Sequence, residues 1–496
     1  MATTLAALTA LLGVGVANAG PVLSPAQDIL FPSTAHSSNP LIYSGGNTPY
    51  FTGPNVNGIA NEVPEQCTVQ QAAYIVRHGS RFPDSGSYSS WVALEEKIQA
   101  AVQSEGFEAR GALSFIADWK TVLTNTTLQM SQESMTGRKE AVDLGYTLRA
   151  RYPDFYEDGQ PFYVWANQYA YPISTSRVVQ TAQAFLLGYM YEFADTYGTV
   201  VSVNSTGSVN AIGNSLGPSD ACPLYVNDAY NNVTNWDATW MPAAIKRINA
   251  LVSGNLTFTE TDLTFFPYLC AYESQIKGRL SDWCNVFTQD ELTKYAYSQD
   301  LSYWYGVGPG SSDPTKLLFL PFLESFLDLL AQGPDQNGTN VDGTPFTVPK
   351  LIMAFLNDNQ IAELTAGMDL FKDQESLPDD KIPANHLYNV AHFITMRGTV
   401  AFEVLNCETT TNKKTTEETY LRILLNDAVY PLPMCKDGPG SSCLLSEYVT
   451  YIKKKNAEAG NFIDYCNVTE AGHPETVAGA SFFTDLTQDF LTLVSP

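Results

Sequence analysis

The sequence predicts an α/β fold, a sheet with helices on both faces, because short apolar runs typical of buried strands alternate with segments of helical periodicity. The expected strands cover residues 69–76, 162–168, 350–356, 398–405 and 419–425. The expected helices cover residues 91–104, 136–151, 174–190 and, within a loop-rich helical stretch from about 201 to 344, 317–332. Ser90 is the expected cap of the first helix, and Ser174 or Thr175 of the third.

The composition describes a large acidic protein. Its 496 residues are 44% apolar, enough for a sizeable core, and its net charge is −25. An acidic surface of this size repels nucleic acid and anionic membranes, so neither is an expected partner. The acidity also suits an acidic medium, although a role in solubility alone explains it equally well.

The first residues have the pattern of a secretory leader. Residues 1–19 form an apolar run that ends in Ala17-Asn18-Ala19, a small-x-small cleavage signal. No later apolar stretch is long enough to span a membrane. Residues 20–66 are rich in Pro, Ser, Asn and Gly and predict an extended N-terminal arm. We therefore expect a secreted or cell-wall protein.

Sequons and cysteines agree with an extracellular location. Six N-x-S/T sequons are candidate glycosylation sites: Asn125, Asn204, Asn232, Asn255, Asn337 and Asn467. The eight cysteines, an even number, favour disulfides over a zinc site, since there is no C-x-x-C and no histidine cluster: Cys67, Cys222, Cys270, Cys284, Cys407, Cys435, Cys443 and Cys466. Their spacing leaves the pairing open.

The segment VRHGSRFP, residues 76–83, places a histidine between two arginines directly after a strand. Guanidinium groups match phosphate oxygens bidentately, so Arg77 and Arg81 are candidate phosphate ligands, joined by Arg177 at a helix start. Gly79 would let the backbone approach the anion closely. His78 at the centre is a candidate nucleophile, because histidine can form a covalent intermediate. No metal or cofactor is needed for this chemistry.

A second polar pair follows another strand. Asn357 and Asp358 come after residues 350–356, and ligands of α/β sheets bind beyond the carboxyl ends of the strands. We expect this pair to share one cleft with Arg77 and His78. Asp358 is the candidate proton donor to the leaving alcohol. A helix cap is the structural alternative for either residue.

The cluster RHGSRFP resembles the histidine acid phosphatases, whose fungal branch includes secreted acid phosphatases and phytases. Further matching segments are MTGRKEAVDLGYTLRARYP (135–153), STSRVVQTAQAF (174–185), FTQDEL (287–292), DLSYWYGVGPG (300–310), MRGTVAFEVLNC (396–407) and NDAVYPLPMCKDGPGSSC (426–443). The resemblance covers nearly the whole chain after residue 45.

The resemblance implies a fold and a division of the chain. It implies a mixed sheet flanked by helices, a phosphoglycerate-mutase-like core, with an inserted, mainly helical domain and the active site between them. Residues 67–496 would form this unit, with the core at about 67–85, 160–200 and 345–496 and the insert at about 86–159 and 201–344. The implied disulfides are Cys67–Cys407, Cys222–Cys466, Cys270–Cys284 and Cys435–Cys443.

The resemblance also implies the roles of the site residues. His78 would form a phosphohistidine, and Arg77, Arg81 and Arg177 would bind the phosphate. The family has a His-Asp pair where this chain reads Asn357-Asp358. Asn357 can still donate a hydrogen bond to phosphate, but it cannot carry a positive charge.

The sequence therefore predicts a secreted acid phosphatase acting on small-molecule phosphate monoesters. Whether phytate is a substrate stays open, although the segment 84–97 offers one lysine against three acids. The alternative is a catalytically impaired glycoprotein that only binds phosphate esters, with Asn357 as the sign of decay. The sequence does not indicate an oligomeric state.

Overall fold

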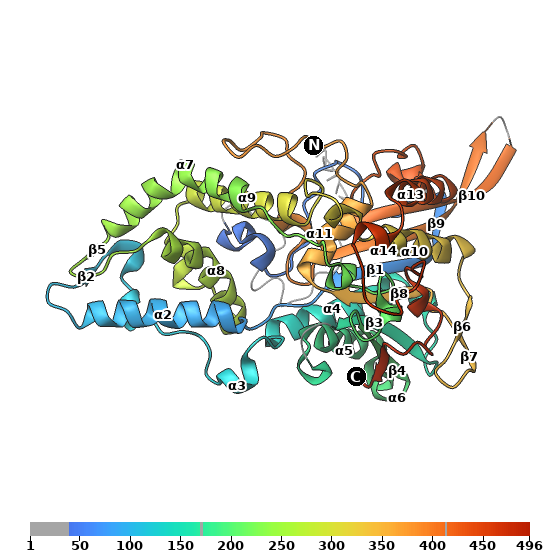
Figure 1. Ribbon diagram of the computed structural model, residues 1–496, viewed down its shortest axis with the longest axis horizontal. Helices are drawn as coiled ribbons and strands as arrows, with labels where there is room; N and C mark the ends of the chain where they lie inside the picture. The colour runs from blue at the N-terminus through green and yellow to red at the C-terminus, as the bar shows by residue number, and fades with distance from the viewer. Residues whose placement is uncertain (1–38, 169–171, 412–413) are drawn as a thin grey trace, which may run out of the picture.

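The computed structural model describes residues 39–168, 172–411 and 414–496. The expected leader at 1–19 and residues 20–38 of the expected arm lie outside these ranges. A mixed sheet with helices on both faces occupies one end of the molecule, and a helical region extends from it (Figure 1). This arrangement confirms the predicted α/β class.

The described part of the main sheet contains nine strands. Their order is β11-β10-β9-β1-β8-β3-β4-β13, and β12 pairs with β10. The strands β1, β8, β3 and β4 are parallel, and the outer strands join antiparallel. Their bounds are β1 Cys67–Arg77, β3 Phe162–Gln168, β4 Gly198–Asn204, β8 Leu351–Leu356, β9 Thr399–Thr411, β10 Lys414–Leu425, β11 Ala428–Val429, β12 Cys443–Leu444 and β13 Leu491–Val494. Two small ribbons pair β2 Glu108–Ala109 with β5 Val252–Ser253, and β6 Asn337–Thr339 with β7 Pro345–Thr347.

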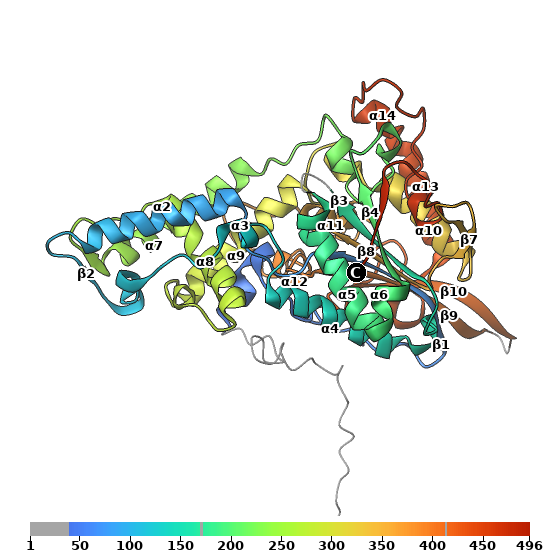
Figure 2. The same cartoon turned by 90° about the horizontal axis from the view of Figure 1, so that it is seen from below.

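Helices cover the sheet and build the extension. Those around the sheet are α4 Met135–Arg151, α5 Arg177–Met190, α6 Ala194–Tyr197, α10 Leu320–Gln332, α11 Asp358–Gly367, α12 Val390–Phe393, α13 Leu445–Ala459 and α14 Phe462–Tyr465. The extension consists of α2 Ser85–Val102, α7 Tyr230–Asn249, α8 Glu260–Lys277 and α9 Gln289–Gly306, with the single-turn helix α3 Thr126–Gln129 beside it (Figures 1 and 2). No helix in the described ranges combines the length and the apolar character needed to cross a membrane.

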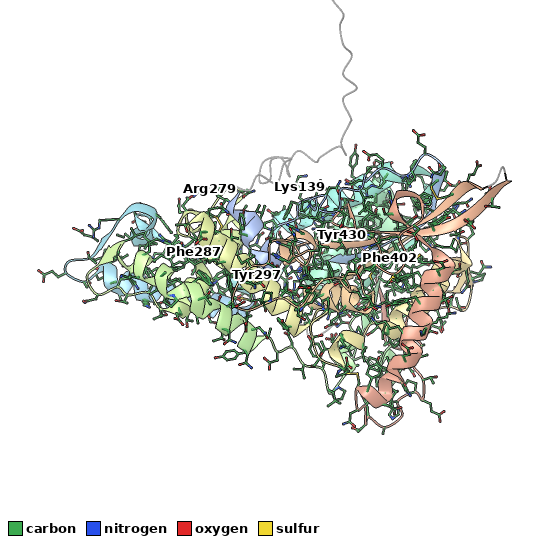
Figure 3. The ribbon with its side chains drawn as sticks, turned by 90° about the horizontal axis from the view of Figure 1, so that it is seen from above. Lys139, Arg279, Phe287, Tyr297, Phe402 and Tyr430 are labelled. Carbon is green, nitrogen blue, oxygen red and sulfur yellow. A yellow bond between two sulfur atoms is a disulfide. The ribbon has the colours of Figure 1, made fainter. Side chains whose placement is uncertain are left out.

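Alternation along β1 sends side chains to two different cores. Tyr74 and Val76 pack with α4 and α5, whereas Ala73 and Ile75 belong to the core of the opposite face. That second core continues without a break from the sheet into the helical extension, where Phe287 and Tyr297 lie, while Phe402 lies within the sheet (Figure 3). The sheet and the extension are therefore held together by one apolar interior.

The expected domain boundaries remain a prediction. The packing of one helix, α4, is relevant to the boundary between the core and the insert. α4 lies within residues 86–159, a range expected as insert, yet its apolar face packs with α5 against the sheet. The strand 162–168 has the expected bounds, and β9 and β10 extend further than expected toward their shared hairpin.

Two expected helix starts are wrong. The expected cap Ser90 lies inside α2, which begins at Ser85, six residues before the expected start, because Asp84 caps it: Asp84 Oδ1 accepts a hydrogen bond from the Ser87 N–H at 2.9 Å. The third helix is capped by Ser176 and not by Ser174 or Thr175, which lie in a preceding 3₁₀ turn.

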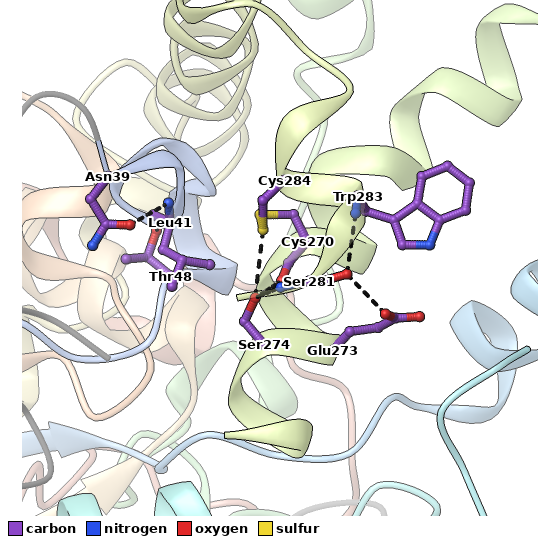
Figure 4. Close-up of a disulfide and its surroundings, with 9 residues drawn as sticks. All are labelled: Asn39, Leu41, Thr48, Cys270, Glu273, Ser274, Ser281, Trp283 and Cys284. Atoms are coloured by element: carbon purple, nitrogen blue, oxygen red, sulfur yellow. Dashed lines mark hydrogen bonds between the residues drawn. A yellow bond between two sulfur atoms is a disulfide. The ribbon is translucent and has the colours of Figure 1, made fainter. Parts of the chain in front are cut away.

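Four disulfides join the cysteines in the pairs that the resemblance implies: Cys67–Cys407, Cys222–Cys466, Cys270–Cys284 and Cys435–Cys443. Cys67 and Cys407 are register partners on β1 and β9. Cys270–Cys284 ties α8 to the turn that follows it, where Ser281 donates a hydrogen bond to Glu273 (Figure 4).

Candidate active site

The sheet brings the two predicted polar pairs together at one edge. Arg77, the last residue of β1, is the register partner of Leu356, the last residue of β8. His78 follows the first strand, and Asn357 and Asp358 follow the second. Arg77 Nη2 donates to Asp358 Oδ2 at 3.0 Å, so the two pairs share one site, as the sequence predicts.

His78 is held as a neutral imidazole. Its Nδ1 lies 2.9 Å from the carbonyl oxygen of Gly79. Because a carbonyl only accepts, this contact places the ring proton on Nδ1 and leaves the lone pair on Nε2. Burial, reinforced by the charges of Arg177, Arg77 and Arg81, lowers the pKa of His78 well below its usual value. The ring therefore stays unprotonated, and nucleophilic, into the acidic range.

Arg77 is fixed from three sides. Its side chain is 1% exposed, and Nη1 donates to the carbonyl oxygens of Ile394, at 2.7 Å, and of Gly46. Its buried Nε has no hydrogen-bond acceptor among the described residues. Several donors are thus committed to protein while one buried donor remains for a ligand.

Arg81 lies against an aromatic wall. Its guanidinium carbon is 5.4 Å from the ring centroid of Tyr272, and its Nη1 donates to the carbonyl oxygen of Phe82 at 3.1 Å. Nη1 also lies 3.6 Å from Asp84. Within the described residues, the buried Nε of Arg81 also lacks an acceptor. These contacts orient the guanidinium and leave it able to receive an anion.

Asp358 forms the acidic side of the site. Tyr303 Oη donates to its Oδ2 at 2.8 Å, and the carboxylate is 30% exposed. Burial raises the pKa of Asp358, but the charge of Arg77 and the Tyr303 hydroxyl outweigh that effect and hold the pKa at about 2. Without a ligand, Asp358 is therefore ionised even in moderately acidic medium.

Arg177 and Asn357 open onto a cavity. Arg177 Nη2 donates to Asn357 Oδ1 at 3.4 Å, and both residues line, with Asp358, a cavity of about 450 Å³. The other walls are polar: Asn167, Ser176, Ser219, Asp220, Tyr225, Asn359 and Gln360, with Val178. Asn357 is also the N-cap of α11. Its position therefore fits both interpretations offered for it, a ligand of the phosphate and a helix cap.

Gly79 has a packing role in addition to the one expected. Its N–H donates to Thr181 Oγ1 at 3.0 Å, so this amide is not aimed at an anion. A Cβ there would lie 2.7 Å from the Gly137 carbonyl oxygen of α4. From the same helix, the buried Glu140 accepts hydrogen bonds from the Ser80 N–H at 2.8 Å and the Ser80 hydroxyl at 2.9 Å. The glycine thus allows α4 to hold the motif loop closely.

Sequence reasoning missed several residues that contact the site residues but lie far from them in the sequence. Tyr303, Tyr272, Gly46 and Glu140 act through contacts between segments far apart in the chain. Two segments that resemble the family contain members of this set: residues 300–310 contain Tyr303, and residues 135–153 contain Glu140.

The sequence is similar to known proteins along most of its length. The family model for the histidine phosphatase superfamily (branch 2) matches residues 68–426. A constitutive acid phosphatase of Saccharomyces cerevisiae is 28% identical over 485 residues, which cover 96% of this chain and 95% of that protein. A phytase of Candida albicans is 26% identical and covers 89% of this chain and 90% of its own length.

Among solved structures, the phytase from D. castellii has a TM-score of 0.75 and 25% identity, covering 95% of this chain and 94% of that one. Together with the arginine-surrounded histidine at the strand edge, the family match over most of the sequence assigns the chain plainly: it belongs to the histidine phosphatase superfamily, branch 2.

Proposed function

We propose that the protein is an acid phosphatase that hydrolyses phosphate monoesters through a phosphohistidine on His78. The observation that carries this proposal is a buried, neutral imidazole among three guanidinium groups, with its Nδ1 bonded to a backbone carbonyl. Phosphoryl transfer needs positioning and neutralisation of charge above all, and arginines supply both. The names of the relatives, acid phosphatases and phytases, agree with this chemistry.

The first step transfers the phosphoryl group to the enzyme. Arg77, Arg81 and Arg177 hold the phosphate oxygens while His78 Nε2 forms a bond to phosphorus. The ester P–O bond breaks, and the departing alkoxide takes a proton from Asp358. In the second step water attacks the phosphohistidine, its proton passes to the Asp358 carboxylate, and inorganic phosphate leaves.

Asp358 must first obtain that proton, because its pKa is about 2 in the empty site. A bound phosphate adds negative charge next to the carboxylate and offsets the arginines, which raises the pKa of Asp358. Since the second pKa of a phosphate monoester is about 6, a monoester in acidic medium is a monoanion. The substrate therefore brings the required proton with it, and an acidic optimum follows.

The cavity beside Arg177, Asn357 and Asp358, where the leaving group would lie, suits simple monoesters better than phytate. Arg177 is the one basic side chain among its described lining residues, so the cavity offers a substrate a single cation. Lys97, the single lysine of residues 84–97, is bonded to Asp262 at 2.5 Å. A hexaphosphate would meet too few cations here, so we propose a broad phosphomonoesterase with weak phytate hydrolysis.

We also propose that the protein is secreted and glycosylated. The four disulfides are typical of an oxidising compartment. The sequon residues Asn125, Asn255, Asn337 and Asn467 are exposed, and Asn204 and Asn232 are partly exposed. Mass spectrometry of the secreted protein before and after endoglycosidase treatment tests both statements.

The rival function is binding of phosphate esters without turnover. Retention of the neutral His78, the arginines and Asp358 supports catalysis, whereas Asn357, in place of the histidine of the family's His-Asp pair, is the departure that favours the rival. Turnover of p-nitrophenyl phosphate between about pH 3 and 6 decides between them. Tight phosphate binding without any turnover would favour the rival.

A further inference from the structure

The carboxyl ends of four neighbouring parallel strands form one polar edge of the main sheet. β1 ends with Arg77, and β8 is followed by Asn357 and Asp358. β3 and β4 lie next to β8 in the sheet and run parallel to it (Figure 1). Asn167 lies at the end of β3, and Ser205 directly follows β4. Since neighbouring strands are about 4.8 Å apart, this edge continues the phosphate site by about 10 Å.

The leaving alcohol must lie along this edge. Asp358, the proposed donor of a proton to the departing oxygen, lines a cavity of about 450 Å³ that Asn167 and Asp220 also line. Side chains from β3 and from the segment after β4 therefore face the same space as the proton donor. In the described wall of this cavity Val178 is the only aliphatic residue and Tyr225 the only aromatic one. An alcohol that enters the cavity thus exchanges water for polar groups more than for apolar surface.

Asp220 is placed to receive a hydroxyl group. It is partly exposed, and its Oδ2 accepts a hydrogen bond from the Ser205 hydroxyl at 2.6 Å. A Cβ on Gly217 would lie 2.4 Å from Asp220 Oδ2 and 2.9 Å from Asn167 Nδ2, so these two polar groups lie close to each other beside Gly217. Both side-chain amide atoms of Asn167 are buried and have no hydrogen-bond partner among the described residues. The wall beside Asp220 therefore has unused capacity for hydrogen bonds.

The segment that contains Asp220 is held in place by the first turn of α11. Gln360 Nε2 donates to Ser219 Oγ at 3.4 Å, and Asn359 Nδ2 donates to Tyr225 Oη at 3.3 Å. Burial raises the pKa of Asp220 to about 6, against the opposing effect of its polar neighbours. In acidic medium its carboxyl group is therefore protonated. In that form it does not repel phosphate, and it can both donate and accept a hydrogen bond.

We propose that Asp220, with Asn167 beside it, binds hydroxyl groups of the leaving alcohol and so selects phosphate monoesters of polyols. The inference rests on the proposed phosphatase activity and on Asp358 as the proton donor. A polyol can pair with the polar groups of the cavity, whereas a simple alkyl alcohol leaves them unpaired after displacing their water. The enzyme therefore hydrolyses esters of small polyols, such as glycerol or a sugar alcohol, faster than esters of simple alcohols.

The test compares glycerol 2-phosphate with isopropyl phosphate, which is the same ester without its two free hydroxyl groups. For the wild type we expect kcat/KM to favour glycerol 2-phosphate by at least about tenfold. Asp220→Ala should lower this ratio about tenfold, and Asp220→Asn, whose amide still forms hydrogen bonds, should keep most of it. Asp228→Ala, which removes an exposed carboxylate of the same segment, is the matched control and should keep the full ratio. The different reactivity of the two leaving groups is common to all variants and cancels.

The outcomes separate this inference from the proposed function. Hydrolysis of both esters with the same kcat/KM overturns the hydroxyl site alone. An equal loss on both esters in Asp220→Ala would make Asp220 structural and would also overturn the site. Absence of turnover on every ester overturns the proposed function, and this inference with it.

A binding measurement on the wild type decides the question if Asp220→Ala does not fold. The probes are 2,3-dihydroxypropylphosphonate and propylphosphonate, which differ only in two hydroxyl groups and contain a C–P bond in place of the ester bond. The first should inhibit the hydrolysis of p-nitrophenyl phosphate competitively, with an inhibition constant about tenfold lower than that of the second. Equal inhibition constants would contradict recognition of hydroxyl groups.

Discussion

At the scale of single residues, the chemistry depends on one neutral nitrogen, Nε2 of His78. Replacing His78 by Ala should abolish turnover, because a covalent nucleophile has no substitute, while folding is retained. Enzyme denatured in alkaline detergent, in which a phosphohistidine is stable, after exposure to ³²P-labelled substrate should carry label in the wild type and none in the variant. His473→Ala, a partly exposed histidine remote in sequence from the motif, is the control and should keep both label and activity. Label retained without His78 would assign the attack to another group.

Asp358 should matter in proportion to the basicity of the leaving group. Asp358→Asn keeps the size of the side chain but removes the acid, so glycerol phosphate should suffer far more than p-nitrophenyl phosphate, whose phenolate leaves readily unaided. We expect the difference in the loss of kcat/KM to be about a hundredfold. This parameter reports the first chemical step and avoids dephosphorylation. An equal loss on both substrates would make Asp358 a positioning residue.

Asn357 is the position where the chain departs from its family. Asn357→His restores a side chain that can carry positive charge beside the phosphate, next to Arg177. We expect kcat/KM for p-nitrophenyl phosphate to rise several-fold at acidic pH, where the new imidazole is protonated. A fall would mean that the cavity around Arg177 fits asparagine better.

At the scale of elements, the motif loop depends on how closely α4 approaches it. A Cβ on Gly137 would lie 2.0 Å from the Ser80 carbonyl oxygen, so Gly137→Ala must push α4 away from the loop. We expect a loss of about 1–3 kcal/mol in the free energy of unfolding, together with a fall in kcat. Chemical denaturation and steady-state kinetics measure the two effects.

The matched control is Gly86→Ala in α2, where the new Cβ would have Asp84 Oδ1 as its nearest neighbour, at 3.5 Å. Gly86 is exposed in the first turn of α2, and alanine is a better helix former than glycine, so this variant should be as stable as the wild type or more so. Equal behaviour of the two variants would contradict the close-packing argument.

The strands and helices also show how much of the fold and of the site could be predicted from the sequence. The central strands were predictable because buried parallel strands are continuous apolar runs, and β3 has the expected bounds. Helix starts were less predictable, since several neighbouring residues could cap and the sequence pattern does not distinguish Ser176, whose hydroxyl accepts from the Val179 N–H, from Ser174 or Thr175. Arg77, His78 and Asp358 could be found from the ends of strands. Tyr303 and Tyr272 could not, because no local pattern reveals their contacts with Asp358 and Arg81, which lie far away in the sequence.

At the scale of the whole molecule, buried carboxylic acids should make the folded protein more stable at acidic pH than at neutral pH. Glu363 of α11 is fully buried, and burial, with the nearby charge of Asp220, raises its pKa to about 8. In the unfolded chain the carboxyl ionises near its usual value of 4.5, so between these two values the folded state holds a proton that the unfolded state has lost. Stability should therefore fall as the pH rises through this window, by up to about 1.4 kcal/mol per pH unit for this one group.

Glu363→Gln removes the titration and should flatten the dependence. We expect the variant to lose less stability than the wild type between about pH 5 and pH 8, as measured by urea unfolding at each pH. Glu458→Gln, at an exposed side chain of α13, should follow the wild-type curve. A wild-type stability that rises over this range would contradict the assignment of a buried, protonated Glu363.

The strand order has a consequence for the synthesis of the chain. β1, which ends in the catalytic motif, pairs with β8 and β9, and β8 also separates it from β3. A ribosome that has reached residue 340 has made β1 and β3 but neither of the strands that β1 pairs with. Contacts this distant in sequence form slowly and leave apolar strand faces uncovered meanwhile. The catalytic motif therefore takes its working position only after about four-fifths of the polypeptide has been made, when both β8 and β9 are available to pair with β1.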